Sequence, residues 1–243
     1  TDSAVTRGDG VFETILVAGS QPHDLAAHLD RLALSAGLLE IDVPVTEAWY
    51  PAVAALVEAW AERCPGEPDF SLRLTATRSG TRFATAASIP AETIAARAGI
   101  SVILAPDPFN RRVPYLTAAA KTLSYAINMA ALRHARTRGA DDVVFVRDDG
   151  TVSESPTATV VLAVGDEFVT PPSGPGTGIL DSITVRRLAP RRAPVTAHEL
   201  LEADAVSLVS SVRLAAPVTA IDAMPRAHDP ERAARVIDTL LAR

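Results

Sequence analysis

The spacing of hydrophobic residues along the first hundred positions predicts a strand, two helices and a second strand. Residues 11–17 are almost continuously apolar and follow a glycine-rich turn signal, which favours a strand. Leucines recur at helical spacing within residues 24–35, and a second helix is expected over residues 46–64, after the cap residue Thr46. Residues 70–77 alternate as a strand does.

The remaining residues predict a different mixture of elements. A proline-rich irregular stretch at residues 106–114 is a candidate linker. Helices are expected at residues 124–138, near Asp181 and at residues 230–241. Strands are expected at residues 100–104, 143–146, 151–152, 159–164, 206–209 and 218–221.

This order of elements predicts the fold class and the domain organisation. Strands and helices are mixed without a regular βαβ alternation, which is typical of an α+β protein. We expect two subdomains: a smaller N-terminal one over residues 1–105, the linker at 106–114, and a larger C-terminal one over residues 115–243.

Composition narrows the classes of partner. The chain has 243 residues and a net charge of −6, so it lacks the basic excess typical of a nucleic-acid-binding protein. It contains no apolar run of about 18 residues and no signal sequence, which predicts a cytoplasmic protein that does not span a membrane. The single cysteine, Cys64, rules out an internal disulfide, and the five histidines fall at no metal-site spacing. We therefore expect no metal.

One count points to chemistry. Only one of the 23 basic Lys and Arg residues is a lysine, Lys121. A lysine amine can lose its proton when it is desolvated and then attack a carbonyl carbon, whereas a guanidinium stays protonated. Codon bias is the alternative explanation. The neighbouring residues, Leu116 to Leu123, include no carboxylate, which favours a buried reactive amine able to form a Schiff base.

A lysine that carries an aldehyde cofactor needs further groups around it. The ring nitrogen of such a cofactor needs a carboxylate, for which Glu154 is the candidate, and its phosphate needs an anion pocket. Arg31 offers a forked donor, while a glycine-rich loop precedes Ser182-Ile183-Thr184 and an expected strand ends at Ser210-Ser211. Each of these features taken singly is also typical of an exposed side chain or a helix cap.

Several motifs occur together in one order, and in that order the chain resembles the class IV aminotransferases. These are the fold type IV enzymes that use pyridoxal 5'-phosphate (PLP), with the cofactor in the cleft between the two subdomains. The resemblance covers nearly the whole chain. Its motifs are Arg7 to Thr14, His28 to Leu32, Lys121 to Tyr125, Asp149 to Glu154, Thr170 to Pro172, Gly178 to Thr184, and Val209 to Ser211.

The resemblance implies a role for each matching position. Lys121 would bond covalently to PLP and shuttle protons, and Glu154 would pair with the pyridinium nitrogen. The phosphate would be held by Arg31, Ile183, Thr184 and Ser211. The family usually has asparagine at the position of Thr159, glycine at Ser182 and arginine at Val185. The resemblance also implies a homodimer.

Within the family, the chain is most similar to the short lyase-type members, in residues 121–124 and 207–213. This similarity implies conversion of 4-amino-4-deoxychorismate to 4-aminobenzoate and pyruvate, a reaction of folate biosynthesis. The alternatives are transamination of D-amino acids or branched-chain amino acids, and a catalytically inactive binding protein with this fold. An arginine suits a substrate carboxylate, and the candidates are Arg78, Arg82, Arg111 and Arg112.

Overall fold

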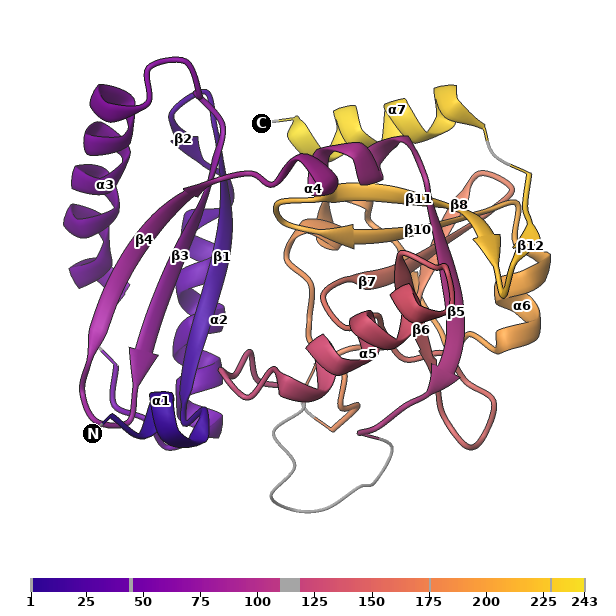
Figure 1. Ribbon diagram of the computed structural model, residues 1–243, viewed down its shortest axis with the longest axis horizontal. Helices are drawn as coiled ribbons and strands as arrows, with labels where there is room; N and C mark the ends of the chain where they lie inside the picture. Colours follow the sequence, from indigo (N-terminus) through magenta and orange to yellow (C-terminus); the bar gives the residue numbers. More distant parts are fainter. Residues whose placement is uncertain (1, 44–45, 110–118, 175, 228, 243) are drawn as a thin grey trace. The chain divides into compact units, whose positions relative to one another are not determined.

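The chain divides into two compact units in a computed structural model that describes residues 2–43, 46–109, 119–174, 176–227 and 229–242 (Figure 1). Unit 1 comprises residues 1–90 together with Ala120–Tyr125. Unit 2 comprises Ala91–Ala119 and Ala126–Arg243.

Unit 1 is built on an antiparallel four-stranded sheet in the order β2-β1-β3-β4. Its strands are β1 (Gly10–Ala18), β2 (Gln21–Pro22), β3 (Phe70–Thr77) and β4 (Arg82–Ser88). Its helical segments are α1 (Ser3–Arg7), α2 (Leu25–Leu38), the 3₁₀ turn η1 (Thr46–Ala48) and α3 (Trp49–Arg63).

The two long helices of unit 1 cover the same face of this sheet (Figure 1). Successive side chains of a strand point to opposite faces, so Val11 and Ile15 of β1 share one face and pack with Leu29 of α2 and Val53 of α3. Each such buried side chain contributes roughly 1.5–3 kcal/mol. By the same alternation Glu13 lies on the helix-covered face, and Phe12 lies on the other.

Unit 2 contains a larger mixed sheet in the order β6-β5-β11-β10-β7-β8-β9, with β12 paired to β11. Its strands are β5 (Ile100–Pro106), β6 (Asp142–Val146), β7 (Thr159–Val164), β8 (Glu167–Thr170), β9 (Arg191–Arg192), β10 (Ala205–Ser210), β11 (Leu214–Ile221) and β12 (Met224–Pro225). Its helical segments are α4 (Ala91–Ala95), η2 (Ala96–Ala98), α5 (Ala126–Thr137), η3 (Thr184–Leu188), α6 (Ala197–Glu202) and α7 (Pro230–Leu241).

The interior of unit 2 is filled by the apolar strands of this sheet. Val160, Leu162, Leu208 and Val218 belong to one buried cluster. A second cluster lies where Ala135 of α5 meets β5 and β6. The strands β5 and β6 are parallel, and α5 lies in the connection between them, as the geometry of a parallel pair requires.

The expected α+β class with two sheets is confirmed, but the chain divides differently from the expected boundary at residue 105. The strand β5 pairs with β6 and β11, so residues 91–105 belong to unit 2. Conversely, Ala120–Tyr125 joins unit 1, because Thr122 bridges to Val11 of β1. Residues 110–114 of the expected linker lie outside the described residues.

Three local expectations also differ from the structure. Thr151 and Val152 form only isolated bridges, to Thr196 and Val146, because each pairs with a different segment. The helix expected near Asp181 is the short 3₁₀ turn η3, which begins at Thr184. The strand β4 has no counterpart in the prediction, because its burial is too low to impose an apolar alternation.

Candidate active site

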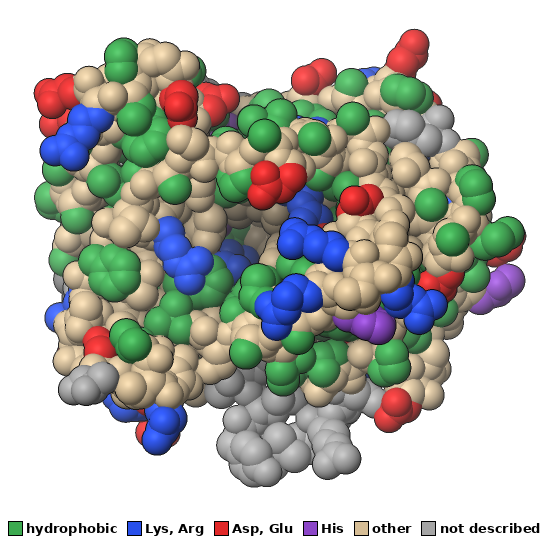
Figure 2. Space-filling model, viewed as in Figure 1, with side chains coloured by type: hydrophobic (Ala, Val, Ile, Leu, Met, Phe, Trp, Pro, Cys, Tyr) green, Lys and Arg blue, Asp and Glu red, His purple; other side chains and the backbone are tan. Residues whose placement is uncertain are grey.

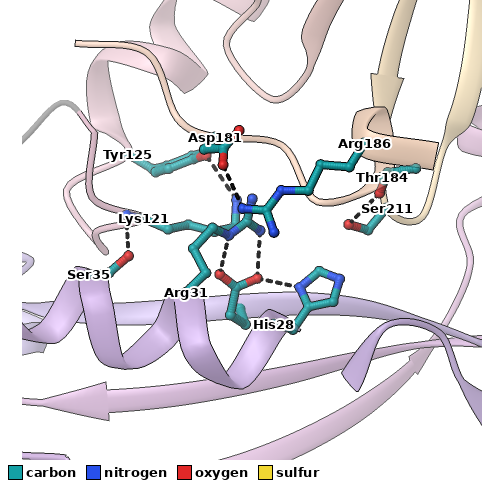
Figure 3. Close-up of polar contacts among 10 residues, drawn as sticks. His28, Arg31, Ser35, Lys121, Tyr125, Asp181, Thr184, Arg186 and Ser211 are labelled. Carbon is teal, nitrogen blue, oxygen red and sulfur yellow. Dashed lines mark hydrogen bonds and ion pairs between the residues drawn. The ribbon is translucent and has the colours of Figure 1, made fainter. Parts of the chain in front are cut away.

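The backbone of Lys121 is fixed to two elements of unit 1. Its amide donates a hydrogen bond to Ser35 Oγ at 3.1 Å, and its carbonyl accepts one from the Phe12 amide at 3.0 Å. Ser35 lies on α2 and Phe12 on β1, so the sheet and its covering helix both position the lysine. Figure 3 shows the Ser35 contact.

The side chain of Lys121 lies against aromatic groups. Its Nζ lies 3.4 Å from the Tyr125 hydroxyl (Figure 3). The same atom lies 4.5 Å from the centroid of the Phe12 ring. The Phe12 and Tyr125 rings meet edge to face, with centroids 5.3 Å apart. Among the described residues no carboxylate forms an ion pair with Lys121. Lys121 is half-buried, and its amine lies against two aromatic rings.

Arg31 belongs to a buried charged network on the helix-covered face of the unit 1 sheet. Its Nε and one terminal nitrogen each donate to a different oxygen of Glu13 at 2.7 Å, and His28 Nδ1 lies 2.7 Å from the same carboxylate. Glu13 is 0% exposed, His28 1% and Arg31 8%. Figure 3 shows that Arg31 and His28 reach the carboxylate from the same helix.

The electrostatics of this network favour an ionised carboxylate. Burial alone raises the pKa of Glu13, but the Arg31 charge, its hydrogen bonds and His28 outweigh burial and lower that pKa to about 2. An ionised Glu13 fixes the orientation of the Arg31 guanidinium with a two-pronged contact.

Thr184 and Ser211, two of the predicted phosphate ligands, lie together in unit 2. Thr184 Oγ1 donates to Ser211 Oγ at 3.1 Å, although 27 residues separate them (Figure 3). Ile183 is buried and precedes η3, and Ser211 directly follows β10. The first amides of a helix have no partner within it, so the start of η3 suits an anion.

Glu154 lies in a loop of unit 2 that runs beside β6. Its carbonyl accepts a hydrogen bond from the Phe145 amide at 2.9 Å, and its Oε2 accepts one from the Leu180 amide at 3.4 Å. The side chain is half-buried. Glu154 and the loop before η3 are thus connected directly.

Asp142 connects two of the candidate ligand segments of unit 2. Its carboxylate is 1% exposed and accepts hydrogen bonds from Ser155 Oγ at 2.9 Å and from Arg213 at 2.7 Å. Ser155 adjoins Glu154, and Arg213 lies two residues after Ser211. Asp142 therefore fixes the loop that carries Glu154 relative to the turn that carries Ser211.

The predicted substrate arginines have other partners or lie outside the described residues. Arg78 donates to Asp9 at 2.6 Å and to the carbonyls of Leu39 and Glu40, and the Asp9 carboxylate raises the pKa of Arg78. Arg82 lies 3.4 Å from Asp42. The predictions for Arg111 and Arg112 concern positions that are not among the described residues.

At two of the three positions where the sequence departs from the family pattern, the structure gives a local reason for the residue present. Ser182 Oγ accepts a hydrogen bond at 3.4 Å from the amide of Val185, the second residue of η3. Val185 is 1% exposed and belongs to the apolar interior. Thr159 begins β7 and is buried. Nothing in the structure explains why this position is not asparagine.

Sequence reasoning missed Glu13, Tyr125 and Asp142 as individual site residues, and it missed Arg73 of β3, whose guanidinium carbon lies 3.7 Å from the centroid of the Phe12 ring. Glu13 could have been found, because it interrupts an otherwise apolar strand and must have a partner when buried. Asp142 carries a weaker signal of the same kind, at the start of an apolar run. The roles of Arg73 and Tyr125 depend on contacts across the fold, which a single sequence does not reveal.

Two further features of the described residues concern partners. They contain no helix long and apolar enough to cross a membrane, and no group of three or more acidic, histidine or cysteine side chains placed to hold a metal ion. On the face shown in Figure 2, basic, acidic and hydrophobic side chains are mixed.

The comparisons with known proteins assign the family. Residues 10–221 match the family model described as amino-transferase class IV, so the chain belongs to the class IV aminotransferases. It is 37% identical to the bifunctional aminodeoxychorismate lyase / D-amino acid transaminase of Mycobacterium tuberculosis, over 99% of this chain and 92% of that protein.

Solved structures agree with this assignment. A fold IV-transaminase from Curtobacterium pusillum has a TM-score of 0.93 and 37% identity, covering 100% of this chain and 89% of that one. A hypothetical aminotransferase from Mycobacterium tuberculosis in its PLP-bound form has a TM-score of 0.90 and 35% identity, covering 99% and 91%. That protein has also been solved with alpha-ketoglutarate and PMP bound. Family membership confirms the expectation of a PLP-dependent enzyme.

Proposed function

We propose that this enzyme is a 4-amino-4-deoxychorismate lyase, which converts its substrate to 4-aminobenzoate and pyruvate, and that Lys121 carries the chemistry. The observation that supports Lys121 is its setting: the only primary amine among the side chains lies over two aromatic rings with no carboxylate paired to it among the described residues. Such an amine is suited to covalent bonding with an aldehyde.

The remaining candidate ligands match the chemical groups of PLP. Lys121 supplies the amine for the aldehyde, and Glu154 supplies a carboxylate for the ring nitrogen. Thr184 and Ser211, whose hydroxyls are adjacent, supply donors for the phosphate together with the Ile183 and Thr184 amides and Arg31. PLP, when bound, withdraws electrons from the substrate carbon that bears the nitrogen.

Lys121 has two tasks in this proposal. It holds the cofactor until the substrate amine replaces it, and Nζ then accepts the proton from the substrate carbon. The Tyr125 hydroxyl at 3.4 Å gives Nζ a hydrogen-bonding partner in the free enzyme. General-base transfer of this kind typically contributes 10²- to 10⁴-fold to a rate.

D-amino-acid transamination is the second candidate function. It is favoured by a specific observation, because the Mycobacterium tuberculosis relative at 37% identity is described as having both activities. The two reactions share the proton removal by Lys121 and differ in the next step. In the lyase reaction the bond between the ring carbon and the ether oxygen breaks, and the ring becomes aromatic. The enolpyruvate that leaves gains a proton at its methylene carbon and so becomes pyruvate.

The experiment separates the reactions by their products. The purified holoenzyme is given 4-amino-4-deoxychorismate, and pyruvate and 4-aminobenzoate are measured; separately, D-alanine is added and the cofactor absorption is followed. Release of both products supports the lyase. Absence of both products, together with rapid conversion of the cofactor to its amine form by D-alanine, would establish the transaminase instead.

Lys121 is tested by chemical trapping. Borohydride reduction of the holoenzyme should attach the cofactor to the peptide that contains Lys121, the only lysine of the chain. Lys121→Arg retains the positive charge but should lower the rate by at least about 100-fold. Exposed Arg63→Gln serves as the matched control and should retain the rate. A holoenzyme whose label lies elsewhere would contradict the assignment.

We also infer that the enzyme is a homodimer, on the basis of the family resemblance. The chain has a mass of 25.5 kDa, so light scattering on the purified holoenzyme should give about twice that value. A mass equal to a single chain at micromolar concentration would contradict the inference.

A further inference from the structure

The second face of the unit 1 sheet carries an arginine, Arg73, close to Lys121. Arg73 lies on β3 opposite Thr14 of β1, so it is diagonal to Phe12 on the face away from α2 and α3. Its guanidinium carbon lies 3.7 Å from the centroid of the Phe12 ring. Phe12 therefore supports Arg73 as well as Lys121.

Arg73 differs from the three arginines of unit 1 that the sequence analysis named as candidate ligands. Arg31, Arg78 and Arg82 each have a carboxylate, supplied by Glu13, Asp9 and Asp42. Among the described residues neither an ion pair nor a hydrogen bond reaches the Arg73 side chain, which contacts the face of the Phe12 ring.

The surroundings of Arg73 make it unfavourable for the guanidinium to stay charged without an anion beside it. Arg73 is half-buried, and this desolvation lowers its pKa, while the nearby Tyr125 raises it. A second cation, Lys121, lies against the same ring. The acidic residue nearest in the sheet, Glu13, lies on the opposite face and is bound by Arg31 and His28. An anionic ligand would compensate the local positive charge.

We infer that Arg73 binds a carboxylate of the amine substrate, an inference that rests on the proposed function. A planar guanidinium donates two parallel hydrogen bonds to a carboxylate, and the contact with the Phe12 ring restricts the movement of the Arg73 guanidinium. Arg73 Cζ lies 3.7 Å and Lys121 Nζ 4.5 Å from the same point, the centroid of the Phe12 ring. The two atoms are therefore at most about 8 Å apart. One small amino acid can contact both groups.

The inference selects a class of substrate. An amine with a carboxylate that can reach Arg73 would be accepted, whereas the same amine with a carboxamide in its place would leave Arg73 without a counter-ion. Discrimination by a charged hydrogen-bonding group is steeper than discrimination by shape, because the wrong ligand leaves the group unpaired. The inference also replaces Arg78, whose three nitrogens each donate to a partner, and Arg82, which has a carboxylate partner in Asp42.

The test compares Arg73→Gln and Arg73→Lys with the unaltered holoenzyme. We expect Arg73→Gln to raise KM for 4-amino-4-deoxychorismate by roughly 10- to 100-fold, with a smaller change in kcat, and Arg73→Lys to recover part of this loss. In the D-alanine half-reaction, the unaltered enzyme should prefer D-alanine to D-alaninamide. Arg73→Gln should abolish that preference.

Controls separate this inference from the proposed function. Arg63→Gln removes an exposed arginine of the same unit and should leave KM unchanged. Each variant is first scanned for the visible band of the bound cofactor and for thermal stability, so a misfolded or empty protein is recognised. An unaltered enzyme without lyase activity contradicts the proposed lyase but leaves the D-alanine comparison intact.

One set of results would overturn the inference. It fails if Arg73→Gln binds the cofactor normally and retains both its KM and its preference for D-alanine over D-alaninamide. It also fails if Arg78→Gln or Arg82→Gln, rather than Arg73→Gln, abolishes that preference.

Discussion

The two units position their candidate site residues in different ways. In unit 1 Glu13 lies on β1 and Arg31 on α2, and a buried ion network connects these two residues. In unit 2 Glu154 and Ser211 lie in loops, and the buried carboxylate of Asp142 connects their neighbours. Balanced buried charges thus position Glu13 and Arg31 in unit 1. In unit 2 the contacts of Asp142, which act as a tether between two loops, position Glu154 and Ser211.

This difference leads to different responses to mutation. Removing one member of a buried ion network leaves an uncompensated charge, which is costly for the whole fold. Removing a tether between loops leaves the apolar core intact and mainly loosens the loops. We therefore expect substitutions in the Glu13 network to affect stability most and substitutions at the Asp142 tether to affect cofactor binding more than stability.

The largest expected effect is that of Glu13→Ala. It leaves the Arg31 guanidinium buried without its carboxylate, so we expect the free energy of unfolding to fall by about 3–5 kcal/mol, measured by urea denaturation. Exposed Asp30→Asn removes the same charge one residue before Arg31 and is the control, with a change within about 0.5 kcal/mol. Equal losses in the two variants would show that the network has no special role.

Acid pH should affect the same network. A carboxyl whose folded-state pKa is lowered stabilises the fold above its unfolded pKa, here 4.5, and that stabilisation is lost as the pH falls towards about 2. The shift corresponds to roughly 3 kcal/mol. The unaltered protein should therefore lose stability steeply between these pH values, whereas Glu13→Gln should show a shallower loss. Parallel curves of unfolding free energy against pH would contradict this source of acid sensitivity.

The sequence predicted regular helices and strands better than it predicted which distant segments pair with each other. The closing helix α7 is found at residues 230–241, as its amphipathic spacing predicts, and β3 occupies residues 70–77. Regular elements carry a repeating pattern that one sequence reveals. The assignment of β5 to unit 2 was not predicted, because partner strands distant in sequence determine it.

For the candidate site, the sequence indicated single residues but not the contacts between distant segments. The sequence indicated Thr184 and Ser211 separately, and the structure brings their hydroxyls together. It did not indicate that Asp142 connects the Glu154 loop to the Ser211 turn, because the contact of Asp142 with Arg213 spans 71 residues. The partners of Arg78 also depend on such distant contacts, with Asp9 69 residues away.

Asp142→Asn tests the tether of unit 2 directly. The amide retains the size of the side chain but loses the charge that Arg213 contacts, so we expect stability to fall by about 2 kcal/mol. Cofactor affinity, measured by titrating the protein with PLP, should fall as well, because the Glu154 loop and the Ser211 turn lose their connection. Exposed Asp148→Asn is the matched control. If Asp142→Asn is less stable but binds PLP as tightly as the unaltered protein, the contacts of Asp142 support the fold and do not affect cofactor binding.

The smallest expected effect concerns the hydroxyl pair of unit 2. Thr184→Val and Ser211→Ala each remove one end of a single hydrogen bond, so each should cost about 1 kcal/mol of stability without cofactor. Their double variant should lose less than the total of the two, since both single changes break the same bond. For PLP affinity we expect the opposite pattern. If each hydroxyl donates separately to the phosphate, the two losses in PLP affinity should add. Additive losses without cofactor would show that the hydroxyls are independent there, and a non-additive loss of PLP affinity would show that only one of them contacts the phosphate.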